Sequence, residues 1–110
     1  MEKVKIEDFG KLDLRVATVL DVAPHPNADR LYVLQLQVGS EKKQIVAGVK
    51  KFYGEDELRG RKIVIVNNLE PSVIRGVESN GMLLAASNAE KTMLSLIGPE
   101  RQLDDGARVG

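Results

Sequence analysis

The sequence predicts an all-β protein, a small curled sheet with one short helix. Three observations support this fold class. Segments of seven to eleven residues in which apolar and polar side chains alternate recur along the chain. Glycine and proline separate these segments at turn positions. Near the middle of the chain, one short segment begins with a run of acids, as helices often do.

The first half of the chain predicts three strands after a short lead-in. Residues 7–11 (EDFGK) form a turn of helix or an irregular entry. Pro24 and Pro26 end the first strand, because proline cannot donate a hydrogen bond to a sheet. Gly39 begins a hairpin turn between the second and third strands. The three strands are expected at residues 13–23, 30–38 and 43–49.

The second half predicts a helix, two strands and a C-terminal extension. Residues 54–59 (GEDELR) place acids at the start of a short helix, where they interact favourably with its dipole. A fourth strand at residues 61–69 ends before Pro71. A polar connection then leads through Gly81 to a fifth strand. That strand and two later apolar runs are expected at residues 82–87, 93–97 and 107–109.

Three strands, a helix and two closing strands form the pattern of an OB fold, a five-stranded Greek-key barrel. The chain adds a C-terminal extension to it, and a small β-sandwich remains an alternative. The segment 63–66 (IVIV) is apolar on both faces, although the outer face of a lone barrel strand should be polar. Either the chain's own terminal segments or a second subunit therefore covers this face.

Length and composition predict one domain, residues 1–110, with a normal apolar fraction of 43%. The absence of cysteine excludes disulfides and thiolate metal sites. No apolar run has the length of a signal peptide or of a membrane span, so we expect a cytoplasmic protein without a membrane partner.

Charge is balanced overall but uneven along the chain. Sixteen basic and sixteen acidic residues argue against binding nucleic acid through net charge alone. Between residues 42 and 62, seven cations oppose three acids, so that segment is net +4 and the rest is net −4. The folded chain could therefore carry a basic face, or these charges could be scattered and solvated.

The residues of unusual chemistry fall on the two loops that OB folds use for recognition. The first loop (PHPNADRL) holds Asn27, a donor and acceptor, and Arg30, a phosphate-binding side chain. The second (VIRGVESNGM) offers an arginine for phosphate, two hydrogen-bonding side chains and a soft apolar one: Arg75, Ser79, Asn80 and Met82. Turn formation alone explains both loops equally well. His25, the single histidine, is expected to face solvent or to cap the first loop.

The sequence predicts no enzyme and no cofactor. It lacks phosphate-binding glycine motifs, zinc-protease motifs and a nucleophile turn. With one histidine and no cysteine, the common nucleophile–base pairs are absent. Its two Phe and two Tyr make a poor stacking platform for single-stranded nucleic acid. Loops rich in Arg, Ser and Asn suit structured RNA better, and two copies of the chain would strengthen binding.

Four segments together resemble the tRNA-binding domain family: DFGKLDLRVATVLDVAPHPNADRLYVLQLQVG, IVAGVKKFY, LRGRKIVIVNNLEP and RGVESNGMLLAAS. This family includes free-standing dimeric tRNA-binding proteins, C-terminal domains of methionyl-tRNA synthetases, domains of eukaryotic synthetase cofactors, and a branch of secretion chaperones. Two positions differ from common family residues: Ala17 stands where glycine is frequent and Asn80 where glutamine is.

The resemblance implies an OB-fold homodimer that binds tRNA by its shape, without catalysis. The binding residues that it implies are Asn27, Arg30, Arg75, Ser79 and Met82, with Lys50 and Lys51 on a basic face. A start at Met1 favours a free-standing protein over an excised methionyl-tRNA synthetase domain. A peptide-binding chaperone and a structural dimerisation domain are the alternatives.

Overall fold

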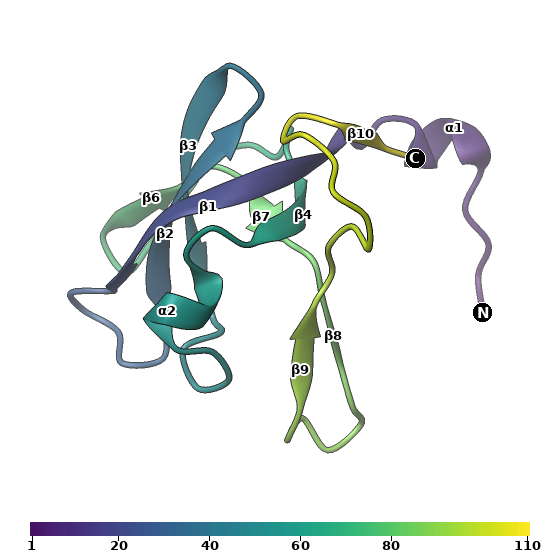
Figure 1. Cartoon of the computed structure of the whole chain (residues 1–110). Coiled ribbons are helices and arrows are strands. Elements are labelled where there is room, and N and C mark those ends of the chain that lie inside the picture. Colours follow the sequence, from purple (N-terminus) through teal and green to yellow (C-terminus); the bar gives the residue numbers. More distant parts are fainter.

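One curled antiparallel sheet forms the centre of the computed structural model, which describes all 110 residues (Figure 1). Its main strands are β1 (Leu14–Pro24), β2 (Tyr32–Val38), β3 (Glu41–Ala47), β4 (Lys62–Val66) and β7 (Met82–Leu83). They are hydrogen-bonded in the order β3-β2-β1-β4-β7, and each pairing is antiparallel. The predicted all-β class is confirmed, as is the predicted succession of three strands, a helix and further strands along the chain.

Short elements surround this sheet. The helix α2 (Glu55–Leu58) lies between β3 and β4, as predicted, and α1 (Ile6–Phe9) precedes β1. Two small hairpins and one further strand, which pairs with the start of β1, make up the rest. These are β5 (Ser72–Ile74) with β6 (Val77–Ser79), β8 (Ala85–Ser87) with β9 (Leu94–Leu96), and β10 (Arg108–Val109).

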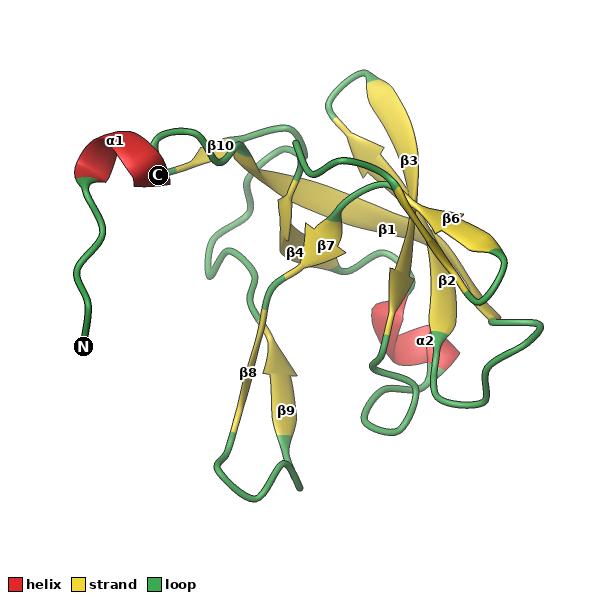
Figure 2. Ribbon diagram, turned by 180° about the vertical axis from the view of Figure 1, so that it is seen from behind, coloured by secondary structure: helices red, strands yellow, loops and turns green.

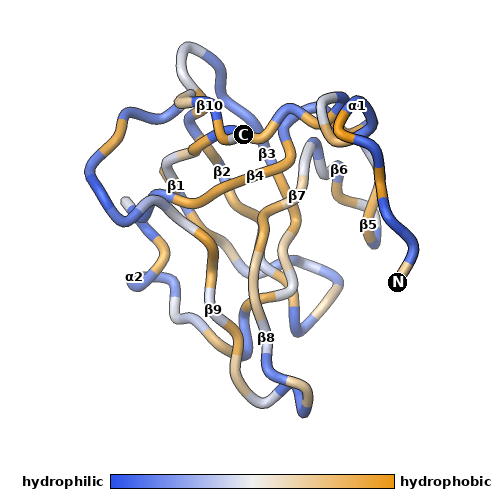
Figure 3. The backbone as a smooth tube through the Cα atoms, turned by 90° about the vertical axis from the view of Figure 1, so that its right-hand side faces the viewer, coloured by the Kyte–Doolittle hydropathy of each residue, from blue (hydrophilic) through white to orange (hydrophobic).

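The core lies inside the curl of the sheet, because alternate residues of each strand point there. Along β2, Tyr32, Leu34, Leu36 and Val38 are buried, and the residues between them are more exposed. Leu58 of α2 is fully buried and joins the same cluster, so the helix plugs one end of the barrel. Figure 3 shows the apolar segments concentrated in the strands and the polar segments in the loops.

The chain's own tail covers the outer face of β4. All four residues of the IVIV segment are buried. The backbone N–H of Val64 donates to the carbonyl of Ile97 at 2.8 Å, and the N–H of Leu84 donates to the carbonyl of Val64 at 3.0 Å. Of the two covers considered for this strand, the C-terminal segment is therefore the one found, and no second subunit is needed there.

Two details of the sequence prediction are wrong. The connection after Pro71, expected to be a polar loop, contains the β5–β6 hairpin. Its two-residue turn has positive φ at Arg75 (52°) and Gly76 (88°), the conformation of a type I′ turn. The expected fifth strand at 82–87 is also not continuous. It divides at Leu84 into β7, which stays in the barrel, and β8, which leaves it with β9 (Figure 1).

The N-terminal segment projects away from the barrel (Figure 2). The four residues of α1 bury no side chain. Its exposed apolar side chains include Val4, Ile6, Phe9 and Leu12. A helix of four residues gains little stability from its own hydrogen bonds, and these apolar side chains remain exposed within one copy of the chain. No helix in the structure has the length and apolar character to cross a membrane.

Candidate nucleic-acid interface

The structure brings together the two loops that the sequence singled out. The turn of the β5–β6 hairpin contacts the β1–β2 loop (residues 25–31) through a reciprocal pair of hydrogen bonds. The Nδ2 amide of Asn27 donates to the carbonyl of Arg75 at 3.2 Å. The Nη2 of Arg75 donates to the carbonyl of Asn27, also at 3.2 Å. Residues 48 positions apart in sequence thus form one continuous surface.

His25 joins the same two loops from beneath. Its ring is only 5% exposed. Nδ1 accepts the backbone N–H of Asn27 at 2.9 Å, so Nδ1 carries no proton. Nε2 lies 2.9 Å from the carbonyl of Ile74 and therefore holds the ring proton and donates it. The expectation that His25 faces solvent is wrong; its capping role is found, and it extends to both loops.

Ser79 lies in the interior, unlike the surface position expected of an RNA contact. Its side chain is 3% exposed. Its hydroxyl accepts the N–H of Val46 on β3 at 2.9 Å and donates to the carbonyl of Gly81 at 3.2 Å. The hydroxyl thereby satisfies a donor on the open edge of β3. The structure assigns Ser79 to closing the barrel, and its proton is not free for a ligand.

Asn80 and Met82 follow on the same segment. The N–H of Asn80 donates to the carbonyl of Gln44 at 2.8 Å, which continues the closure of the barrel. The side chain of Asn80 is half-buried and makes no hydrogen bond. Met82 is 49% exposed at the end of the sheet, where it pairs with Val66. Met82 therefore presents its thioether surface outward instead of filling the core.

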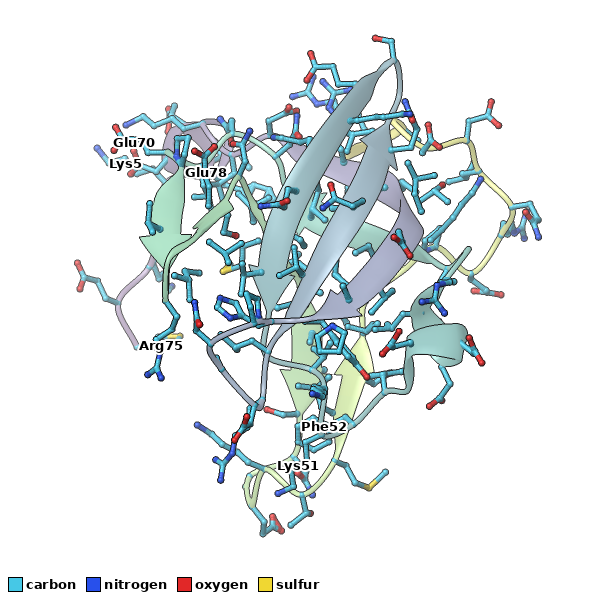
Figure 4. The ribbon with its side chains drawn as sticks, turned by 90° about the vertical axis from the view of Figure 1, so that its left-hand side faces the viewer. Lys5, Lys51, Phe52, Glu70, Arg75 and Glu78 are labelled. Atoms are coloured by element: carbon cyan, nitrogen blue, oxygen red, sulfur yellow. The ribbon has the colours of Figure 1, made fainter.

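Four basic side chains are free at this part of the molecule. Arg30, Lys50, Lys51 and Arg75 take part in none of the five salt bridges of the structure. Figure 4 shows Arg75 and Lys51 toward the same end of the barrel, while Glu70 and Glu78 lie toward the opposite end. The hairpin thus carries Arg75 at one end and Glu78 toward the other, with Glu70 just before its first strand.

The aromatic side chains do not form a stacking platform there. Tyr32 is buried, and its hydroxyl donates to the carbonyl of Tyr53 at 2.8 Å. Phe52 is partly buried, with the Nζ of Lys51 at 5.8 Å from its ring centre. A cation over one ring is a different arrangement from a row of exposed rings on which successive bases stack.

The net +4 segment does not form one basic face. Lys43 donates to the carbonyl and to the side-chain oxygen of Asn67. Arg59 bonds Asp21, Glu55 and Asp56. The hydrogen bond to Asp21, followed by those to Glu55, raises the pKa of Arg59. Carboxylates thus neutralise Arg59, and hydrogen bonds to Asn67 hold Lys43 in place, so neither side chain joins the cations at the paired loops.

Asp13 organises the opposite end of β1. Its carboxylate accepts hydrogen bonds from Asn67 at 3.0 Å and from Arg15 at 2.7 Å. The Asn67 bond, with a smaller contribution from Arg15, lowers the pKa of Asp13. Elsewhere too, acidic side chains serve such local contacts, and no three His, Cys, Asp or Glu side chains gather as a metal site would require.

The fold and its paired loops define a small all-β binding module. The chain belongs to the tRNA-binding domain family: residues 14–108 match the family described as "Putative tRNA binding domain". Membership of a binding-domain family confirms the prediction of a module that is not itself an enzyme.

Relatives and solved structures agree with this family. The chain is 51% identical, over 109 residues, to the methionine–tRNA ligase of Thermococcus onnurineus; the match covers 99% of the chain and 15% of the ligase. The chain thus spans about 15% of the length of that relative. A methionyl-tRNA-synthetase-related protein from Pyrococcus horikoshii has a TM-score of 0.93 at 32% identity, with both chains fully covered. The chaperone CsaA of Bacillus anthracis has a TM-score of 0.88 at 29% identity, and the match covers 99% of this chain and 100% of CsaA.

Replacing Ser79 with alanine is predicted to destabilise the fold. The N–H of Val46 would lose its acceptor in a buried place, which costs about 1–3 kcal/mol. Urea denaturation followed by circular dichroism measures the difference. Ser72→Ala is the matched control, because Ser72 lies exposed on the same hairpin and its side chain makes no hydrogen bond. Equal stability of the two variants would contradict the closing role of Ser79.

Proposed function

We propose that this chain binds tRNA without catalysis, as a homodimer that selects the folded shape of the RNA. It works in the cytoplasm, either free-standing or as the C-terminal part of a methionyl-tRNA synthetase. Family membership and the similarity to methionine–tRNA ligases support tRNA as the partner. The remaining parts of the proposal rest on the geometry of the loops and of the N-terminal segment.

The observation that carries the proposal is the joining of the two loops. Through Asn27, Arg75 and His25, they form one surface that exists before any ligand arrives. A preformed surface lowers the ordering cost of binding. Arg75 at the tip of its turn has a guanidinium that suits phosphate, and Arg30, Lys50 and Lys51 add charge nearby.

Within this surface, the proposed contacts differ in kind. Arg30, Arg75 and the two lysines contact phosphates. Asn27 is suited to a 2′-hydroxyl or a base edge. Asn80 and Met82 follow β6 toward Val66, away from the paired loops, and would contact a more distant 2′-hydroxyl, base edge or ribose face. Ser79 supports them from the interior. Because few aromatic side chains are exposed, such a surface reads the phosphate arrangement of a folded RNA better than it binds a flexible strand.

The homodimer is proposed from the N-terminal segment. Its apolar side chains are exposed within one copy, and Ile6 is 77% exposed. A second copy of the chain that packs there would bury them and would bring two RNA-binding surfaces into one particle. The second surface then binds at a high effective concentration, which strengthens the binding of a large RNA.

A peptide-binding chaperone is the second candidate, and the similarity to CsaA supports it. Such a function would use exposed apolar side chains, such as Val73 and Met93, instead of the loop cations. The two candidates differ in their response to salt. Binding through phosphate contacts weakens as salt rises, whereas binding through apolar surface does not.

Arg75→Asn tests the tRNA interface without weakening the turn. Asparagine followed by Gly76 is the preferred type I′ pair, so the hairpin remains while the guanidinium is lost. We expect about tenfold weaker tRNA binding, since a hydrogen bond to a charged group contributes about 1.5–3 kcal/mol. Filter binding over a salt series should give a slope of about −4 for about five phosphate contacts, reduced by about 1 in the variant.

The control is Arg108→Asn on β10, which removes the same charge away from the paired loops. Its affinity should stay near that of the unaltered chain. Unstructured RNA of equal length should compete poorly. If it competes as well as tRNA, selection of folded shape is wrong; if Arg75→Asn binds like the control, the interface is placed wrongly.

Light scattering at micromolar concentration tests the homodimer. We expect twice the mass of one chain for the unaltered protein and the mass of one chain for Ile6→Asp, since a buried unpaired charge is costly. Val73→Asp is the control, because Val73 is 70% exposed on β5, whose partner strand β6 lies on the opposite side of the molecule from α1 (Figure 2). A single-chain mass for the unaltered protein would exclude the homodimer.

A further inference from the structure

A second group of cations lines a pocket elsewhere on the barrel. The pocket has a volume of about 410 Å³ and lies between residues 60–62, at the start of β4, and residues 98–102, after β9. Its charged lining consists of Arg61, Lys62, Arg101 and one acid, Glu100. Figure 1 shows the segment after β9 on the side of the barrel away from the β1–β2 loop. The pocket is therefore separate from the paired loops.

Arg61 is held in this pocket without an acidic partner. Its guanidinium carbon lies 5.3 Å from the centre of the Tyr53 ring. Tyr53 is itself held at two points. Its hydroxyl accepts the N–H of Leu96 at 3.1 Å, and its backbone carbonyl accepts a hydrogen bond from the hydroxyl of Tyr32. Neither Arg61 nor Arg101 makes a salt bridge or a side-chain hydrogen bond. Arg59, two residues earlier, has three carboxylate partners, so the free state of Arg61 is a local feature.

The walls of the pocket are fixed by backbone packing. A Cβ atom at Gly98 would lie 2.6 Å from the carbonyl of Lys62, so the two segments touch where only glycine fits. Next to this contact, Val64 donates its N–H to Ile97, and the Nζ of Lys62 donates to the carbonyl of Leu103. These contacts hold the segment after β9 against the start of β4 on both sides of residues 99–102, and neither arginine of the pocket is engaged by a carboxylate.

We propose that this pocket binds a phosphate group, and that tRNA supplies it from a part of its backbone that the paired loops do not reach. Guanidinium groups bind phosphate through parallel N–H donors, and three cations against one carboxylate leave the pocket positive. Five of its nine lining residues are charged or polar and only Leu96 has a large apolar side chain, which suits an anion better than an apolar ligand. The inference deepens the proposed function and rests on it for the source of the phosphate.

The double variant Arg61→Gln with Arg101→Gln tests the contribution to tRNA binding. We expect weaker binding and a salt slope reduced by about 1, as the loss of one phosphate contact predicts. Lys42→Gln with Lys91→Gln is the matched control, since it removes two exposed charges outside the pocket and outside the paired loops. Glu100→Gln should change affinity in the opposite direction, because it removes the one carboxylate that repels phosphate.

A titration with inorganic phosphate tests the pocket independently of RNA. In NMR spectra at low salt, phosphate should shift the side-chain N–H signals of Arg61 and Arg101 in the unaltered chain, and more strongly in Glu100→Gln. Such shifts, together with a reduced salt slope of tRNA binding in the double arginine variant, support the proposal in full. Shifts with an unchanged tRNA slope establish the pocket but assign it to free phosphate instead of tRNA.

If these shifts are absent and the double arginine variant binds tRNA like the control, the pocket is not a phosphate site. The proposed function is then unaffected. If the unaltered chain does not bind tRNA at all, the proposed function fails and the proposed tRNA source of the phosphate fails with it. The phosphate titration then decides alone whether the pocket is an anion site.

Discussion

The two hydrogen bonds of His25 connect the recognition loops to each other. With one ring nitrogen on the N–H of Asn27 and the other on the carbonyl of Ile74, this buried side chain holds the β1–β2 loop against the β5–β6 hairpin. The reciprocal bonds of Asn27 and Arg75 lie above it. His25 supplies the buried part of this connection and the Asn27–Arg75 pair the exposed part, and the binding proposal depends on the single surface that they form.

The residues of the second loop divide the work between support and recognition. Ser79 faces inward and satisfies the edge of β3, so the barrel closes beneath the hairpin. Arg75 faces outward from a turn of positive φ. The two roles fall on different parts of the hairpin, because Arg75 lies in its turn and Ser79 at the end of β6. The residues that form the turn therefore also position the side chain that is proposed to bind the ligand.

Much of the fold could be predicted from the sequence, because apolar and polar side chains alternate along the long strands and Gly or Pro marks the strand ends. The β5–β6 hairpin could not, because its turn places Arg75 where asparagine is the usual signal. The inward orientation of Ser79 was missed because a three-residue strand is too short to show its phase. The partner of His25 is a backbone carbonyl 49 residues away. Every residue has such a carbonyl, so the sequence cannot indicate which one His25 contacts.

The affinity of His25→Ala for tRNA tests most directly whether the joined loops are the binding surface. All the charged side chains remain in this variant, and amide hydrogen exchange can verify that β1, β2 and β3 stay protected while Asn27 loses protection. We predict about tenfold weaker tRNA binding, because the loops must then be ordered by the ligand. Affinity equal to that of the unaltered chain, with Asn27 unprotected, would contradict the account.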